Sequence, residues 1–167
     1  HSVLAGQKHS ELVLPMLNEM LIEGGITLSH LDGFAFGAGP GSFTGLRIAC
    51  GVAQGLAYAA NLPVVGISTL EAVAQKIGEQ KIIVALDARM GEIYHAAYDK
   101  VTDQSWQIIS PPTLCLPQHA PLCAGQDWQG CGSGFDLYYQ LLSAHYNEHL
   151  QRIHCAVRPR ANEIVQL

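Results

Sequence analysis

Apolar residues recur every three or four positions near the start of the chain. Between residues 9 and 22 they fall on one face of a helix, with Ser10 suited to cap its N-terminus and Gly24 suited to end it. Pro15 lies inside this pattern and removes one backbone hydrogen bond, so we expect an early bend. The pattern predicts a helix over 9–24, preceded at 1–5 by the end of a strand.

Strand-like and helical patterns then alternate. Residues 32–37 form a short apolar run that is typical of a buried strand, and residues 63–68 form a second run rich in β-branched side chains. Helical spacing follows each of these runs, at 43–60 and at 69–77. This order of elements predicts an α/β fold.

The second half of the chain begins with the pattern of a hairpin. The apolar run at 82–86 and the run at 92–98 predict two strands joined by a turn, and 106–109 predicts a third strand. This change of pattern predicts two lobes, 1–79 and 80–167. After the third strand we expect, in order, a proline-rich loop at 110–121, a glycine turn at 130–134, a helix over 135–150 and the start of a helix at 161–167.

Composition restricts the functions that are open to the chain. Apolar residues make up 49% of the 167 residues and charged residues only 14%, so we expect a partner to cover part of a largely neutral surface. The formal net charge is −5 and no cluster of Lys and Arg occurs in the sequence, which argues against a free-standing nucleic-acid binder. A role near RNA would be indirect or confined to a small patch.

Membrane insertion and disulfide bonding are both disfavoured. The apolar stretch 43–60 is long enough to be considered as a membrane span, but it contains Arg47 and Gln54, so a buried helix is the better interpretation. The five cysteines are odd in number and no pair has CxxC spacing. We therefore predict reduced thiols in a cytosolic protein.

A glycine-rich turn joins the strand at 32–37 to the helix at 43–60. Backbone N–H groups in such a turn can hold an anion together with a helix N-terminus. No lysine follows the glycines, so the turn is not a P-loop, and we expect weak or absent ATP binding. The alternative is a tight turn that needs glycine only for its backbone shape. The residues of this turn are Gly37, Gly39, Pro40, Gly41, Ser42 and Gly45.

The helix at 43–60 is apolar on nearly all sides, and small residues recur in it at four-residue spacing. Such a helix is either covered by its own chain or packed against another subunit. We predict a subunit interface, because the helix at 9–22 also has more apolar surface than a small lobe can bury. The candidate partner-binding residues are Leu12, Met16, Leu17, Met20, Leu46, Ile48, Val52 and Leu56.

Two sequence blocks resemble the TsaB (YeaZ) family. The first is GAGPGSFTGLRIACGVAQGLAYAANLPVVGISTLEAVA and the second is DARMGEIYHAAY, and the likeness runs in order from about Lys8 to Tyr98. The resemblance implies an actin-like ATPase (RNase H-like) fold of two lobes. Members of the family open with a hairpin and end with a C-terminal tail that this sequence lacks, so we expect the chain to be part of a longer protein.

The resemblance also implies a function. The family is expected to support a TsaD-type catalytic subunit that forms N6-threonylcarbamoyladenosine at position 37 of tRNAs reading codons that begin with A. A TsaE-type ATPase is a further expected partner, and a homodimer is expected when the catalytic partner is absent. The resemblance further implies a cytoplasmic protein that needs no cofactor and reaches tRNA only through the complex.

Catalysis by the chain alone is disfavoured at the positions that correspond to a metal site. TsaD proteins carry HLEGH, an HxxxH pair suited to metal binding, where this chain has Thr69 and Val73. We therefore predict an accessory subunit with no catalytic residue and no metal. The alternative is a metal-dependent peptidase or a stand-alone ATPase of the same fold. His145 and His149 are a weaker zinc candidate on an expected helix, and Asp87 is more often a turn-ordering residue than an acid-base group.

Overall fold

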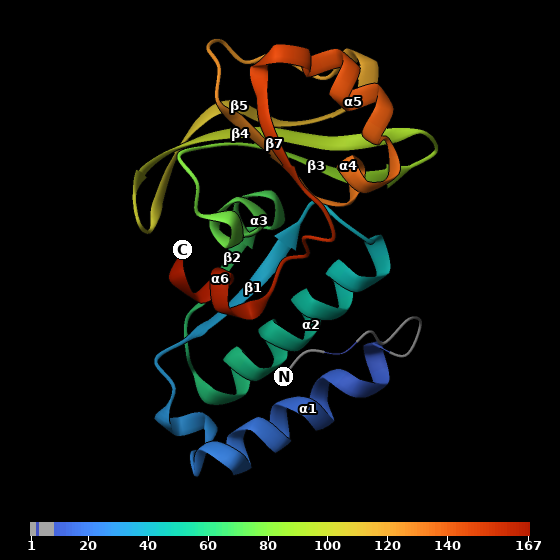
Figure 1. The fold of residues 1–167 in the computed structure, drawn as a ribbon. Helices are drawn as coiled ribbons and strands as arrows, with labels where there is room; N and C mark the ends of the chain where they lie inside the picture. Colours follow the sequence, from blue (N-terminus) through green and yellow to red (C-terminus); the bar gives the residue numbers. More distant parts are fainter. Residues whose placement is uncertain (1–2, 4–8) are drawn as a thin grey trace. The chain divides into compact units, whose positions relative to one another are not determined.

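The structure is a computed structural model that describes residue 3 and residues 9–167. The strand end predicted at 1–5 falls almost entirely outside the described residues. The chain forms two compact units, residues 1–67 and 68–167, and each is described by itself (Figure 1). This division comes earlier in the chain than the lobe boundary predicted at residues 79 and 80, because α3 (Thr69–Ile77) packs on the sheet of the second unit.

The first unit is built from two long helices and a two-stranded sheet. α2 packs on β1 and also contacts α1, which continues through Pro15. The two helices and two strands predicted for this region are confirmed. The elements are α1 (His9–Gly24), a short 3-10 helix η1 (Leu28–His30), β1 (Phe34–Gly39), α2 (Phe43–Ala60) and β2 (Val64–Ser68).

Local sequence determines where α2 begins and ends. The Ser42 hydroxyl accepts a hydrogen bond from the Gly45 N–H at 3.4 Å, which is the contact that a serine makes as an N-cap. At the other end Asn61 takes the left-handed conformation, with φ 52°, and its N–H donates to carbonyls of the last turn. These two caps explain why the predicted bounds of the helix, 43–60, are confirmed.

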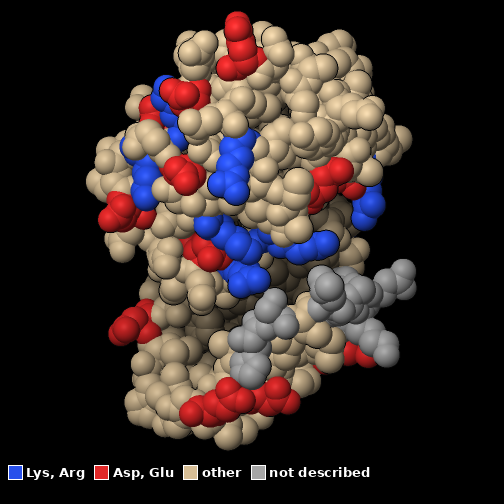
Figure 2. Space-filling model, viewed as in Figure 1, with Lys and Arg blue, Asp and Glu red and all other residues tan. Residues whose placement is uncertain are grey.

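Few apolar side chains of the first unit are buried. Among its described residues only Ala53 and Ala57 of α2 are. Larger apolar side chains such as Ile22, Val65 and Tyr58 are exposed, and Tyr58 is 91% exposed. Figure 2 accordingly shows few charged side chains on the visible face of this unit. A two-stranded sheet is marginal unless its apolar face is covered.

The second unit is a five-stranded mixed sheet. The strand order is β5-β4-β3-β6-β7, in which β3, β4 and β5 pair antiparallel and β3, β6 and β7 pair parallel. Besides α3, the elements are β3 (Lys81–Arg89), β4 (Glu92–Thr102), β5 (Ser105–Cys115), η2 (Pro117–His119), β6 (Trp128–Cys131), α4 (Ser133–Leu137), α5 (Tyr139–Tyr146), η3 (Asn147–His149), β7 (Leu150–His154) and α6 (Ala161–Gln166).

Helices cover both faces of this sheet. Successive residues of a strand point to opposite faces, so Ile82 and Val84 of β3 join a buried cluster with Leu70 of α3. Ile83, between them, joins a second cluster with Phe135 of α4. All five side chains are completely buried, and each contributes about 1.5–3 kcal/mol by leaving water. Figure 1 shows α3 on one side of the sheet and α4 and α5 on the other. The second unit therefore has a core of its own.

The helix predicted over 135–150 is wrong. Tyr138 interrupts it with φ −113° and ψ 32°, and Asn147 ends the second part with φ 42°. The result is two short helices, α4 and α5, followed by strand β7, which the sequence pattern does not predict. The apolar residues after α5 therefore belong to a strand rather than to a continued helix.

The loop predicted at 110–121 and the glycine turn at 130–134 are each wrong in part. β5 continues through Pro111 and Pro112 to Cys115, which is possible because β5 is an edge strand and needs no N–H donor on its outer side. Gly130 lies inside β6, where a Cβ atom would come within 2.6 Å of the Phe135 ring. Glycine is therefore required there for close packing and not for a turn.

His95 of β4 is a buried imidazole between the sheet and α5. Its Nε2 atom lies 2.9 Å from the Tyr146 hydroxyl, which also donates to the Pro121 carbonyl oxygen at 3.2 Å. Its Nδ1 atom is buried and has no hydrogen-bond partner among the described residues. Burial, and secondarily the charge of His145, lowers the pKa of His95 from 6.5 to about 4. The folded protein therefore holds this side chain neutral.

This burial predicts a loss of stability in mild acid. In the unfolded chain His95 binds a proton near pH 6.5, whereas in the folded chain it does so only near pH 4. Between these values the unfolded state binds more protons, so the free energy of unfolding should fall as the pH falls, by up to about 3 kcal/mol. Urea unfolding at pH 7 and pH 4.5 measures this fall. His95→Gln keeps a hydrogen-bonding group but should show a smaller fall, and equal falls in the two proteins would contradict the assignment.

Candidate partner-binding surface

An apolar cavity lies in the first unit between α1, η1, β1 and α2. Its volume is about 450 Å³, and Asn18 is the one polar residue among those that line it. Leu28 contributes from η1 and Phe34 from β1. Cavities of this size and composition are typical of sites that take up apolar groups. The first unit thus combines uncovered helices with a hollow that an apolar side chain can enter.

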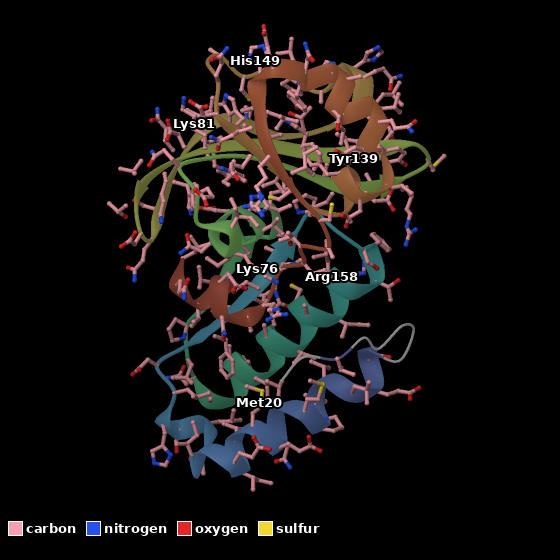
Figure 3. All side chains as sticks on the ribbon, viewed as in Figure 1. Met20, Lys76, Lys81, Tyr139, His149 and Arg158 are labelled. Carbon is pink, nitrogen blue, oxygen red and sulfur yellow. The ribbon has the colours of Figure 1, made fainter. Side chains whose placement is uncertain are left out.

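Three of the eight predicted partner-binding residues meet at this cavity. Leu17 and Met20 reach it from α1 and Leu56 from α2. Met20 is 45% exposed, and Figure 3 shows its side chain on the side of α1 that faces α2. The other five predicted residues are partly buried and do not line the cavity: Leu12, Met16, Leu46, Ile48 and Val52.

Another face of α2 consists of small residues. Gly51 and Gly55 are exposed and four positions apart, so they lie on one face of the helix, and Ala59 continues the row. A Cβ atom built on Gly51 or Gly55 would meet no other atom within 4 Å. Neither glycine is therefore needed for packing inside this unit. A second helix could approach the α2 backbone closely along this row.

The glycine-rich turn is a compact link between β1 and α2. Gly37 and Gly39 end β1, Ser42 caps α2, and Gly45 lies in its first turn. Gly39 has φ 104°, and a Cβ atom there would come within 2.9 Å of Leu46. The backbone shape and the close packing are sufficient reasons for glycine at position 39. Pro40 and Gly41 lie between β1 and the cap, and anion binding by the turn stays a prediction.

Asp87 orders the turn between β3 and β4. One carboxylate oxygen accepts a hydrogen bond from the Arg89 N–H at 2.9 Å, and the other lies 3.4 Å from the Arg89 guanidinium. The Asp87 N–H donates to the Ser133 hydroxyl at 3.1 Å. Arg89 itself has a positive φ of 68°, which this local hydrogen bonding supports. The turn-ordering alternative for Asp87 accounts for all of these contacts.

The positions that correspond to the metal pair of TsaD lie on α3. Val73 is completely buried in the core, and Thr69 is the first residue of the helix. Glu71, the one carboxylate between them, has a pKa raised by burial. A valine offers no ligand atom. Within the described part of the chain, no group of three or more His, Cys, Asp or Glu side chains is arranged to hold a metal ion.

The predicted histidine pair does not share a helix. α5 ends at Tyr146, so His145 lies in that helix and His149 lies in η3. A ring nitrogen of His145 is 2.7 Å from the Ala120 carbonyl oxygen, and one of His149 is 2.7 Å from the Gly125 carbonyl oxygen. The expectation of a shared helix is wrong, and each imidazole is engaged by a loop carbonyl instead.

Two further sequence expectations concern α2 and the cysteines. None of the helices over the described residues combines the length and the apolar character that crossing a membrane requires, and α2 is included in that statement. All five cysteines are free thiols. Burial raises the pKa of the Cys123 thiol to about 11, so this side chain stays protonated near neutral pH.

Sequence patterns did not predict the cavity. Its far wall comes from Ile26, Leu28 and Leu31, which lie in the connection between α1 and β1. The available signal was three apolar residues at short spacing in a segment that has no regular pattern. Only the packing of this connection against α1 places them opposite Leu17 and Leu56.

Comparison with known proteins places the chain in a family. The family model described as "TsaD: tRNA N6-adenosine threonylcarbamoyltransferase" matches residues 3–163. A relative from Escherichia coli, named tRNA threonylcarbamoyladenosine biosynthesis protein TsaB, is 44% identical over 150 residues, which are 84% of this chain and 64% of that protein. A relative of the same name from Haemophilus influenzae is 41% identical over 128 residues, which are 70% of this chain and 54% of that protein.

A solved structure gives the same result. YeaZ from Pseudomonas aeruginosa superimposes with a TM-score of 0.85 at 32% identity, over 95% of this chain and 74% of that one. The chain spans less than two thirds of the length of these two curated relatives. The chain belongs to the TsaB (YeaZ) family and has its α/β fold of the actin-like, RNase H-like type.

Proposed function

We propose that this chain is a non-catalytic subunit that binds and supports a TsaD-type catalytic subunit. The joint product is N6-threonylcarbamoyladenosine at position 37 of tRNAs reading codons that begin with A. The names of the relatives support a role in the biosynthesis of this nucleoside. The observation that carries the partner role is the uncovered apolar surface of the first unit, over α1 and α2.

The physical argument compares the two units. In the second unit the large apolar residues of β3 are buried, whereas in the described part of the first unit only two alanines are. Apolar surface left in water lowers solubility and favours association, and contiguous patches of it mark interaction sites. The cavity can receive an anchoring side chain from a partner, and the row of Gly51 and Gly55 can receive a helix.

The same surface accounts for the proposed self-association. A homodimer with two-fold symmetry uses one patch on both copies. If α1 and α2 form that patch, a second copy and the catalytic subunit compete for it. A TsaE-type ATPase would then bind elsewhere on the assembly, and the cytoplasm is the proposed location for a partner of a tRNA-modifying enzyme.

The non-catalytic role rests on the segment TLEAV. Val73 belongs to the core of the second unit, where it packs with Leu70 and Ile82. Restoring a histidine there would bury an imidazole among apolar side chains at a cost to stability. The alternative function, a metal-dependent peptidase or a stand-alone ATPase, would need ligands or phosphate-binding groups from other positions, and stoichiometric metal or tight ATP binding by the chain alone would favour it.

A bulky side chain in the small-residue row of α2 should block the partner. Gly55→Arg should lower the affinity for the catalytic subunit at least about tenfold, because the new side chain occupies the space of the approaching helix. Its own fold should not suffer, since a Cβ atom added at Gly55 would meet no other atom within 4 Å and arginine favours helix more than glycine does. Isothermal titration calorimetry of the two purified subunits measures the affinity.

Two control variants make this test specific. Gly55→Ala raises helix propensity without bulk and should bind more tightly than Gly55→Arg. Ala144→Arg adds the same charge to an exposed position of α5 in the second unit and should leave the affinity unchanged. Normal binding by a folded Gly55→Arg protein would place the interface elsewhere.

Reconstitution separates the accessory role from catalysis. Neither subunit alone should modify tRNA at an appreciable rate, whereas the mixture with the ATPase should. The isolated chain, purified without chelators, should carry much less than one equivalent of zinc or iron, because Val73 cannot ligate a metal. Modified nucleoside is measured by liquid chromatography after digestion, and metal by elemental analysis. A chain that modifies tRNA alone would overturn the accessory role.

A further inference from the structure

Three basic residues of the second unit form a patch at the end of α3. Lys76 lies in the last turn of α3, and Arg158 and Arg160 flank Pro159 just before α6. The Lys76 ammonium donates a hydrogen bond to the Arg158 carbonyl oxygen at 3.3 Å. Figure 3 shows Lys76 and Arg158 near each other. We refer to Lys76, Arg158 and Arg160 as the basic patch.

The backbone around the two arginines is held in place. Pro159 disfavours the helical conformation for Arg158, the residue before it. Arg160, the residue after it, is extended with φ −134° and ψ 161°. α6, which follows at once, packs on α3. The Gln75 side chain also donates to that of Gln166 at 3.1 Å. The arginine side chains thus project from a segment that is anchored at several points.

The charges of the patch are not neutralised by nearby carboxylates. Arg158 and Arg160 are exposed, and none of the three residues forms an ion pair within 4.0 Å with another described residue. Glu163 follows in α6, but its Oε2 atom is buried. Figure 2 shows Lys and Arg side chains gathered over α3 and the segment that leads to α6. In a chain of net charge −5, three unpaired cations at one place need a reason.

We propose that the basic patch binds phosphate groups of an RNA, namely the tRNA on which the assembly acts, and this inference rests on the proposed function. Arginine presents a planar fork of N–H donors that matches a phosphate. Phosphate contacts position a nucleic acid without reading its sequence, which suits a subunit that serves many tRNAs. The small patch also agrees with the overall negative charge, because the catalytic subunit would supply the remaining contacts.

An acidic protein surface is the other possible partner, and the composition of the patch argues against it. Protein interfaces have an apolar core with a polar rim. Among the described residues of α3, of the segment 142–160 and of α6, Val165 is the one large apolar side chain that is exposed. A single exposed valine does not make an apolar core, so the patch offers mainly charge and hydrogen bonds, and this combination favours a phosphate backbone.

The test uses the chain assembled with its catalytic subunit, with unmodified tRNA as the probe. Filter binding between 50 and 200 mM salt gives the affinity and its salt dependence. The double variant Arg158→Ala/Arg160→Ala should bind tRNA at least about tenfold more weakly at the lower salt concentration. The slope of log affinity against log salt should become shallower by about 1.4–1.8, since each of the two lost phosphate contacts removes about 0.7–0.9.

Two controls distinguish charge from structure. Arg158→Lys/Arg160→Lys keeps both positive charges and should retain most of the salt slope. Arg89→Ala removes one exposed positive charge at the β3–β4 turn and should leave tRNA binding unchanged. The variants should melt at nearly the same temperature as the parent chain, because the replaced side chains are exposed.

The outcomes separate this inference from the proposed function. If the double alanine variant still assembles and binds tRNA with unchanged affinity and slope, the inference is overturned while the accessory role stands. If the variant instead loses the catalytic subunit or the ATPase with no effect on tRNA, the patch serves an acidic protein and the inference is likewise overturned. Failure of the unaltered chain to bind the catalytic subunit would overturn the proposed function, and this inference with it.

Discussion

Burial of apolar side chains against the two faces of a five-stranded sheet holds the second unit together. β3 supplies alternate residues to both faces, and α3 covers one of them while α4 and α5 cover the other. The first unit has the same kinds of elements but only two strands, and its described residues bury no apolar side chain larger than alanine. This difference in burial motivates the proposed role, because α1 and α2 carry apolar side chains that the described residues of the first unit leave exposed.

Sequence patterns predict those helices whose ends are marked by capping residues. α2 is confirmed at both ends, and α3 begins after Ser68, whose hydroxyl accepts from the Glu71 N–H at 3.4 Å. The bounds of the last helices and strands are harder to predict from sequence, because they depend on tertiary contacts. Tyr138 breaks the predicted helix without any glycine or proline, and β6 is four residues long. Its pairing with β3, distant in sequence, makes it a strand.

The candidate site also depends on tertiary contacts that sequence patterns do not reveal. Helical spacing identified Leu17, Met20 and Leu56 as apolar positions, and the structure brings them together at one cavity. Spacing cannot reveal that the connection after α1 folds back to form the opposite wall. The sequence does not predict the basic patch either, because Lys76 and Arg158 lie 82 positions apart and meet only through the packing of α6 on α3. Composition predicts that any contact with RNA is small, and this stays a prediction.

Amide hydrogen exchange tests the central claim most directly. The chain is measured alone, dilute enough to limit self-association, and then with a saturating amount of the catalytic subunit. Amides that lose solvent access or local opening on binding exchange more slowly. The account predicts that slowing is concentrated in α1 and α2 and that α5 exchanges as before. Slowing confined to the second unit, with α1 and α2 unchanged, would contradict the claim that the uncovered apolar helices bind the partner.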